Sequence, residues 1–290
     1  EPQGSKWHLH GYLALAGNYL LMMFYTTVAG WMIQYFLAIA SGRFNGMDTK
    51  QVEAAFNSIC ANPVTMVVFA CLVVVLGFFI CSFSLQKGVE KVSKFMMLAL
   101  LIIMVILAIN SFTMDGAKEG LSFYLKPDLD RAMEVGIGNV IVGAMTQAFF
   151  TLSLGIGAMA IFGSYIGKER ALLGESINVA ILDTFVAVVS GLIIFPACFT
   201  YGVEAGSGPS LIFVTLPNVF NHMPLGNLWG ALFFVFMTFA ALTTVLAVFE
   251  NILACCRDMF GWSRKKACVV NCLLMIVLSL PCALGFNLLA

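Results

Sequence analysis

Long apolar stretches without a charged side chain recur along the chain, separated by short segments that hold most of its acidic and basic residues. Each stretch reaches or exceeds the roughly 20 residues that a helix needs to cross the hydrocarbon core of a bilayer. The strands of a membrane barrel would instead alternate polar and apolar residues. The pattern therefore predicts an all-α polytopic membrane protein, with seven spanning segments at 11–39, 63–84, 90–112, 137–166, 171–202, 226–258 and 264–288.

The fourth of these segments is unusual because glycine and polar residues interrupt its middle. The string TQAFFTLSLGIG occupies 146–157, within the uncharged run 135–167. Its glycines, serine and threonine favour a break in the helix. A carbonyl freed inside a membrane costs several kcal/mol unless it lines a cavity or binds a ligand. The break therefore predicts a site for a polar or ionic ligand, and discontinuous helices of this kind are typical of secondary transporters.

The connection at 203–225 is too apolar for a solvated linker. Its string GPSLIFVTLP, at 208–217, predicts a short helix tucked back into the protein. Neither a composition shift nor a low-complexity segment marks a domain boundary. We therefore expect residues 1–290 to form a single transmembrane domain, and we expect this to be an internal part of a longer protein.

Composition narrows the class of function. Hydrophobic residues make up 61% of the chain and charged residues 10%, against about 25% charged in a soluble domain. The formal net charge is zero, which argues against a nucleic-acid partner. The nine cysteines are scattered without a CxxC pair or Cys/His cluster, so neither a metal site nor a disulfide framework is expected. No nucleophile–base pair or phosphate-binding loop supports an enzyme.

Basic residues are distributed unevenly over the predicted loops. One alternating set of loops holds ten Lys and Arg residues, including Lys6 and the Arg264-Lys265-Lys266 string, and the other set holds five. Cytoplasmic loops carry the excess of Lys and Arg. We therefore expect a multi-pass protein of the cell membrane, embedded in its lipid bilayer, with residue 1 on the cytoplasmic side.

Polar side chains of four predicted spans gather near the middle of the membrane: Tyr25, Thr151, Asp183 and the Thr243-Thr244 pair. Asp183 lies about 12 residues into its span, which is about 18 Å along a helix and near the centre of a core about 30 Å thick. Transporters place substrate and coupling-ion sites at this depth. A carboxylate there costs at least ~2.5–3.5 kcal/mol, which favours function over structural pairing for Asp183.

The other polar residues have structural alternatives. Thr243 and Thr244 either serve a site or return hydrogen bonds to the preceding turn. Tyr25 is either a ligand-binding group or a packed aromatic with a satisfied hydroxyl. Gln147, one turn before Thr151, either holds helices together or forms part of an ion site. Because these oxygens come without His or thiolate ligands, they suit a hard monovalent cation such as sodium better than zinc, copper or calcium.

Several strings resemble the neurotransmitter:sodium symporter family, and in particular its bacterial amino-acid transporters. They are Gly30-Trp31, GVEK at 88–91, QAFFTLSLG at 147–155, GSY at 163–165, GPSLIFVTLP at 208–217 and FAALTT at 239–244. The resemblance implies a fold of two inverted five-helix repeats with a discontinuous helix six. The seven spans would be helices three to nine, with helices one, two and ten onward outside this chain.

The resemblance also implies roles for individual residues. The substrate would contact Leu21, Tyr25, Phe150, Thr151, Ser153, Ile156, Thr244 and Val248. One sodium site would use Thr151 with Asp183, and a second would use Ala240 through its carbonyl, Thr243 and Thr244. Gln147 would neighbour the anion site of chloride-dependent relatives. Ser164, Tyr165 and Asp258 would form the intracellular gate, and Glu250 would lie near it.

One departure from the chloride-dependent relatives concerns charge: Asp183 replaces their asparagine, and Ala187 occupies the nearby anion position. The resemblance therefore implies sodium-coupled, chloride-independent symport of a hydrophobic amino acid of medium to large size, a small-molecule substrate, by alternating access, with sodium ions and no organic cofactor. An ion channel and a non-transporting membrane subunit are the alternatives.

Overall fold

The computed structural model describes residues 8–83, 89–164, 166–167, 169–200, 202, 209 and 211–288, and the regular structure in these ranges is helical. Six helices are long and apolar enough to cross a membrane. They are α1 (His8–Ala40), α3 (Pro63–Ser82), α4 (Val89–Phe112), α9 (Leu172–Thr200), α11 (Gly226–Phe260) and α12 (Arg264–Leu284). Six of the seven predicted spans and the all-α polytopic class are thus confirmed.

The remaining predicted span, 137–166, is not one continuous helix. It is divided into α7 (Ile137–Thr151) and α8 (Ala158–Ser164), with a non-helical segment between them. A further short helix, α6 (Leu129–Val135), precedes α7, and the two are bent by 93°. Gly136 sits at this bend with φ +92°, a conformation that a residue with a Cβ adopts only with strain.

Shorter helices cover the ends of the long ones. They are α2 (Thr49–Ala61), α5 (Ala117–Leu125), a π-helical turn (Leu211–Thr215) and α10 (Leu216–His222). The start of α2 is fixed by a capping box between Asp48 and Gln51. Phe213 and Leu216 are buried. The predicted short helix tucked into the protein is therefore confirmed for 211–222, while residues 203–208 and 210 lie outside the described ones.

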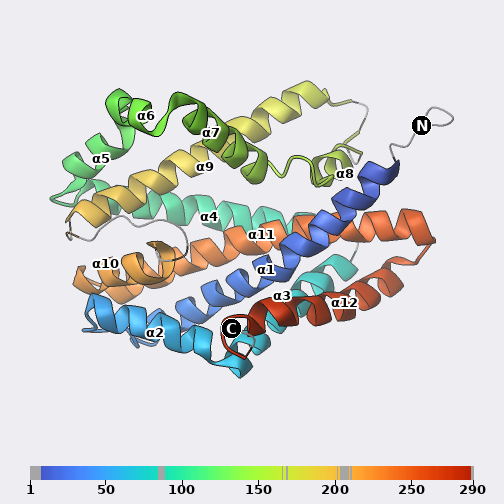
Figure 1. The fold of residues 1–290 in the computed structure, drawn as a ribbon, viewed down its shortest axis with the longest axis horizontal. Coiled ribbons are helices and arrows are strands. Elements are labelled where there is room, and N and C mark those ends of the chain that lie inside the picture. The colour runs from blue at the N-terminus through green and yellow to red at the C-terminus, as the bar shows by residue number, and fades with distance from the viewer. Residues whose placement is uncertain are drawn as a thin grey trace.

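The long helices lie side by side, with α1 crossing α11 and α6 to α8 along one edge (Figure 1). Two clusters of buried side chains fill the space between them. One cluster surrounds Trp31 and Tyr35 of α1. The other surrounds Phe78 of α3 and Phe249 of α11, whose rings stack with centroids 4.0 Å apart. By contrast, α7 buries none of its residues within the chain, so one side of the helix break is open.

A close contact between α5 and α9 depends on Gly120. A Cβ at this position would lie 2.6 Å from the backbone nitrogen and Cα of Pro196, which cannot rotate away. We expect Gly120→Ala to force the helices apart and to lower the free energy of unfolding by about 1–3 kcal/mol. Denaturation of the purified protein in detergent measures this. Gly174→Ala is the control, since its Cβ would meet no atom within 4 Å; equal losses in both variants would contradict the packing argument.

Candidate substrate and ion site

The break between α7 and α8 is built from three residues with positive φ. Gly155 and Gly157 have φ +88° and +84°, and Ser153 has φ +53°. The end of α7 is closed by backbone hydrogen bonds from Leu154 N to Phe149 O (2.9 Å) and from Ser153 N to Phe150 O (3.1 Å). Such a turn satisfies carbonyls that the helix end would leave free. Glycines thus place the interruption where the sequence pattern predicted it.

A cavity of about 390 Å³ lies beside this break. It falls within the size range of small-molecule sites, which begins near roughly 300 Å³. Its walls come from α1, α7, the break and α11, which are far apart in sequence. The lining residues are Leu21, Tyr25, Gln147, Phe149, Phe150, Thr151, Ser153, Leu154, Ile156 and Thr244.

Seven of the eight residues that the resemblance assigned to the substrate line this one cavity. Val248, the eighth, is 1% exposed and packs in the cluster around Phe249. Two lining residues, Phe149 and Leu154, were not singled out in the sequence. Their neighbours in the QAFFTLSLG string were singled out; Phe149 lies in the last turns of α7, and Leu154 lies in the non-helical segment that follows.

The only membrane carboxylate of the predicted cluster reaches the end of α7. Thr151 Oγ1 donates a hydrogen bond of 2.8 Å to Asp183 Oδ1 on α9. The pair joins two helices that are 32 residues apart in sequence. Gln147 lines the cavity one turn before Thr151. The wall of the cavity at the end of α7 thus includes a hydroxyl that is hydrogen-bonded to a carboxylate, with Gln147 one turn away.

A second group of oxygens lies on α11. The hydroxyls of Thr243 and Thr244 donate to the Ala240 carbonyl, at 2.8 and 3.3 Å. These are the bonds to the preceding turn that the sequence left as an alternative. Thr244 lines the cavity together with Tyr25, which places this group of oxygens at the wall of the cavity.

Two asparagines that the sequence did not single out hold the broken segment. The side-chain amides of Asn18 on α1 and Asn251 on α11 both donate to the Ile156 carbonyl, at 2.7 and 3.0 Å. The only signal in the sequence is that each is an amide inside an apolar run. Neither the direction of each amide nor its hydrogen-bonding partner can be predicted from its place in the sequence.

The predicted gate residues lie at the far end of α8 and α11. Ser164 is exposed and donates to Ile161 O at 2.7 Å. Asp258 is exposed near the end of α11. Tyr165 lies outside the described residues. The gate assignment therefore remains a prediction.

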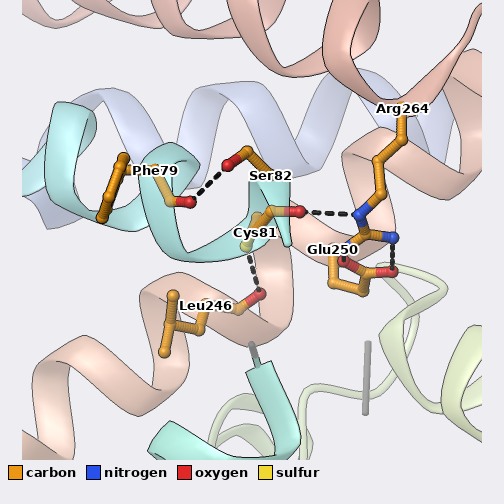
Figure 2. Close-up of polar contacts among 6 residues, drawn as sticks. All are labelled: Phe79, Cys81, Ser82, Leu246, Glu250 and Arg264. Atoms are coloured by element: carbon orange, nitrogen blue, oxygen red, sulfur yellow. Dashed lines mark hydrogen bonds and ion pairs between the residues drawn. The ribbon is translucent and has the colours of Figure 1, made fainter. Parts of the chain in front are cut away.

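A buried ion pair joins three helices near Asp258. Glu250 of α11 is 1% exposed, and its carboxylate accepts from Arg264 of α12 at 3.0 and 2.6 Å. Arg264 Nε also donates to the Cys81 carbonyl at the end of α3, at 2.7 Å, as Figure 2 shows. The sequence places Arg264 in a predicted loop and therefore does not indicate this role. The pair fixes α3, α11 and α12 to one another.

Among the described residues, no group of three His, Cys, Asp or Glu side chains gathers at one place. What the described residues offer is a set of hydroxyl, carbonyl and carboxylate oxygens, which suits a hard cation.

Comparison with known proteins agrees with this chemistry. Residues 43–286 match the sequence profile of the Sodium:neurotransmitter symporter family. An uncharacterized sodium-dependent transporter of Bacillus subtilis is 33% identical over 290 residues, covering 100% of this chain and 63% of the relative. Another from Haemophilus influenzae is 32% identical, covering 97% of this chain and 62% of the relative. The chain thus spans about three-fifths of the length of these relatives.

A solved structure shares the fold. The crystal structure of MhsT in complex with L-phenylalanine superposes with a TM-score of 0.88 and 34% sequence identity. The match covers 99% of this chain and 65% of that one. The likeness therefore extends over the broken helix and the cavity as well as over the long spans.

Proposed function

Because this chain belongs to the Sodium:neurotransmitter symporter family, whose members are transporters and not enzymes, we propose that the whole transporter couples sodium entry to the uptake of a hydrophobic amino acid. The observation that carries the proposal is the cavity of about 390 Å³ at the helix break. It joins an apolar wall to a cluster of oxygens. Alternating access would then expose this cavity to each side of the membrane in turn.

The substrate would lie with its side chain against the apolar wall. Leu21, Phe150 and Ile156 supply that wall, and no charged residue lines it. A charged side chain would therefore be buried without a partner, at a cost of several kcal/mol. Tyr25 and Ser153 would meet the polar ends of the amino acid. The L-phenylalanine in the related MhsT complex supports a substrate of this class.

Sodium would enter with the substrate at two places. Thr151 and Asp183 would bind one ion, and the hydrogen bond of 2.8 Å between them already brings a hydroxyl and a carboxylate together. Ala240, Thr243 and Thr244 would bind the second through a carbonyl and two hydroxyls. Oxygen ligands with at most one carboxylate suit a monovalent ion better than calcium.

Asp183 would also make transport independent of chloride. A sodium ion in a site of low dielectric constant needs negative charge nearby, because Coulomb attraction is stronger there than in water. Asp183 would supply that charge permanently, where chloride-dependent relatives have a neutral asparagine. Ala187, at the nearby anion position, offers no group that would bind chloride.

Enlarging one wall residue tests the assignment of the substrate. We expect Ile156→Phe in the whole transporter to overpack the cavity and to weaken uptake of the bulkiest amino acids by roughly 1–3 kcal/mol, with a smaller effect on medium-sized ones. Competition assays with Leu, Phe and Trp measure this. The assignment is wrong if Glu or Lys competes better than these three in the unchanged transporter.

The location follows from the same proposal. The whole transporter would be a multi-pass protein of the cell membrane, with the start of this chain on the cytoplasmic side. The ion-channel and subunit alternatives predict other results: single-channel currents for the first, and no flux for the second.

A further inference from the structure

The side chains of Asn18 and Asn251 form a pair that is hydrogen-bonded to the helix break at the Ile156 carbonyl. Asn251 Nδ2 donates to Asn18 Oδ1 at 3.0 Å, and both amides donate to the Ile156 carbonyl. Asn18 is 0% exposed and Asn251 is 1% exposed. Both amides are thus shielded from water. A hydrogen bond lost at this site is therefore not replaced by a bond to solvent.

The direction of each amide is fixed by its surroundings. Asn18 Nδ2 donates to the carbonyls of Ala14 (2.7 Å) and Ile156. Rotating the amide by half a turn would place its oxygen against these two carbonyl oxygens. The two donors of Asn251 are likewise used, by Ile156 O and Asn18 Oδ1. The Ile156 carbonyl therefore has one position that satisfies the network.

The same two helices flank this segment through further neighbours. The Ile156 Cγ2 atom would lie 4.0 Å from a Cβ at Gly17 of α1, so the side chain faces α1 at this glycine. A Cβ at Gly157 would lie 3.8 Å from Asn251 Nδ2. The carbonyl and side chain of Ile156 are thus located by neighbouring residues of α1 and α11.

Ile156 is at the same time a wall of the cavity. We propose that Asn18 and Asn251 are positioning residues, which fix the Ile156 carbonyl and thereby set the size of substrate that the cavity accepts. The inference rests on the proposed function only in its transport readout. Without the pair, the Ile156 wall moves outward, and bulky side chains are discriminated against less strongly.

The chain offers a matched control. Asn271 of α12 is also a buried asparagine, 1% exposed. It accepts from the Tyr19 hydroxyl and donates to Ala267 O at 2.8 Å, without contacting the break. Replacement by Leu keeps the number and branching of the side-chain heavy atoms of asparagine and removes its donors. Asn18→Leu and Asn251→Leu are therefore compared with Asn271→Leu.

The first measurement is amide hydrogen exchange of peptides covering 152–158 in the purified whole transporter. A hydrogen bond of ordinary strength corresponds to a change of roughly three- to tenfold in an opening equilibrium. Exchange in these peptides is expected to accelerate by about that factor in the Asn18 and Asn251 variants and to stay unchanged in Asn271→Leu. If Asn18→Leu does not fold, Asn251→Leu carries the test, because it leaves both bonds of the Asn18 amide in place.

The second measurement is selectivity. The ratio of kcat/KM for Trp to that for Leu is expected to rise at least about threefold in both variants and not in Asn271→Leu. If the pair only stabilised the protein, its loss would lower kcat/KM for Trp and for Leu together and leave their ratio unchanged. Unchanged exchange at 152–158, or an unchanged ratio in a transporting variant, overturns the proposal. Absence of sodium-dependent uptake in the unmodified transporter overturns the proposed function instead, and the exchange measurement still decides whether the pair positions Ile156.

Discussion

Replacing Asp183 by Asn in the whole transporter is expected to lower the apparent sodium affinity of uptake at least tenfold, or to make uptake depend on chloride. The carboxylate already accepts a hydrogen bond of 2.8 Å from Thr151, which lines the cavity. A unit charge about 4 Å from the ion contributes on the order of 1–4 kcal/mol, from water to an effective dielectric constant of 20. A tenfold change in affinity corresponds to about 1.4 kcal/mol. Uptake at varied sodium, in chloride and in gluconate, measures both effects.

A second carboxylate on the same helix provides the control. Glu175, near the start of α9, forms an exposed ion pair with Arg170 at 3.0 Å, whereas Asp183 is bonded to the cavity-lining Thr151. Glu175→Gln removes the same charge and is expected to leave sodium and chloride dependence unchanged. If the unmodified transporter loses uptake in chloride-free medium, Asp183 is not the substitute for the anion.

Replacing Glu250 by Leu is expected to destabilise the protein by about 3–5 kcal/mol, because Arg264 loses its carboxylate partner in a largely buried site. The side chain of Arg264 is 18% exposed and that of Glu250 is 1% exposed, so solvent screens the ion pair little. Replacing both residues by Leu is expected to recover most of the loss, since no charge then remains without a partner. Denaturation in detergent, followed by circular dichroism, gives the free energies of unfolding.

The exposed ion pair between Arg170 and Glu175 is the control that distinguishes the effect of burial on stability from the effect of charge. Its side chains are 70% and 33% exposed, and such pairs contribute about 0–1 kcal/mol. Glu175→Leu should therefore change stability by no more than that. Comparable losses at Glu250 and Glu175 would contradict the interpretation that the buried pair fastens α3, α11 and α12 together.

The sequence predicts the spans well because the membrane imposes one demand on all of them. A segment of about 20 apolar residues has to satisfy its backbone internally, and a helix does this. The interruption at 152–157 was also predictable, since Gly155 and Gly157 tolerate positive φ that other residues avoid. Tyr25 and Thr244 were predicted from the mid-membrane position of their hydroxyls, whereas Leu21 was accessible only through the family resemblance.

What the sequence could not supply are contacts between distant residues. Asn18 and Asn251 reach Ile156 across 138 and 95 residues, and a single amide in an apolar helix has no preferred partner. Arg264 looked like a loop charge because its stem lies at the start of α12, while its head group points back to Glu250. Val248 follows Thr244 by one turn, and only the packing around Phe249 decides which neighbours it meets.

Uptake of radiolabelled L-phenylalanine into proteoliposomes containing the whole transporter tests the central claim most directly. The account predicts accumulation above the external concentration when sodium is directed inward, and no accumulation when choline replaces sodium or when the sodium gradient is dissipated. Replacing chloride with gluconate should not alter the result. Uptake that is the same with choline as with sodium, or no uptake of any hydrophobic amino acid, would contradict sodium-coupled symport through this cavity.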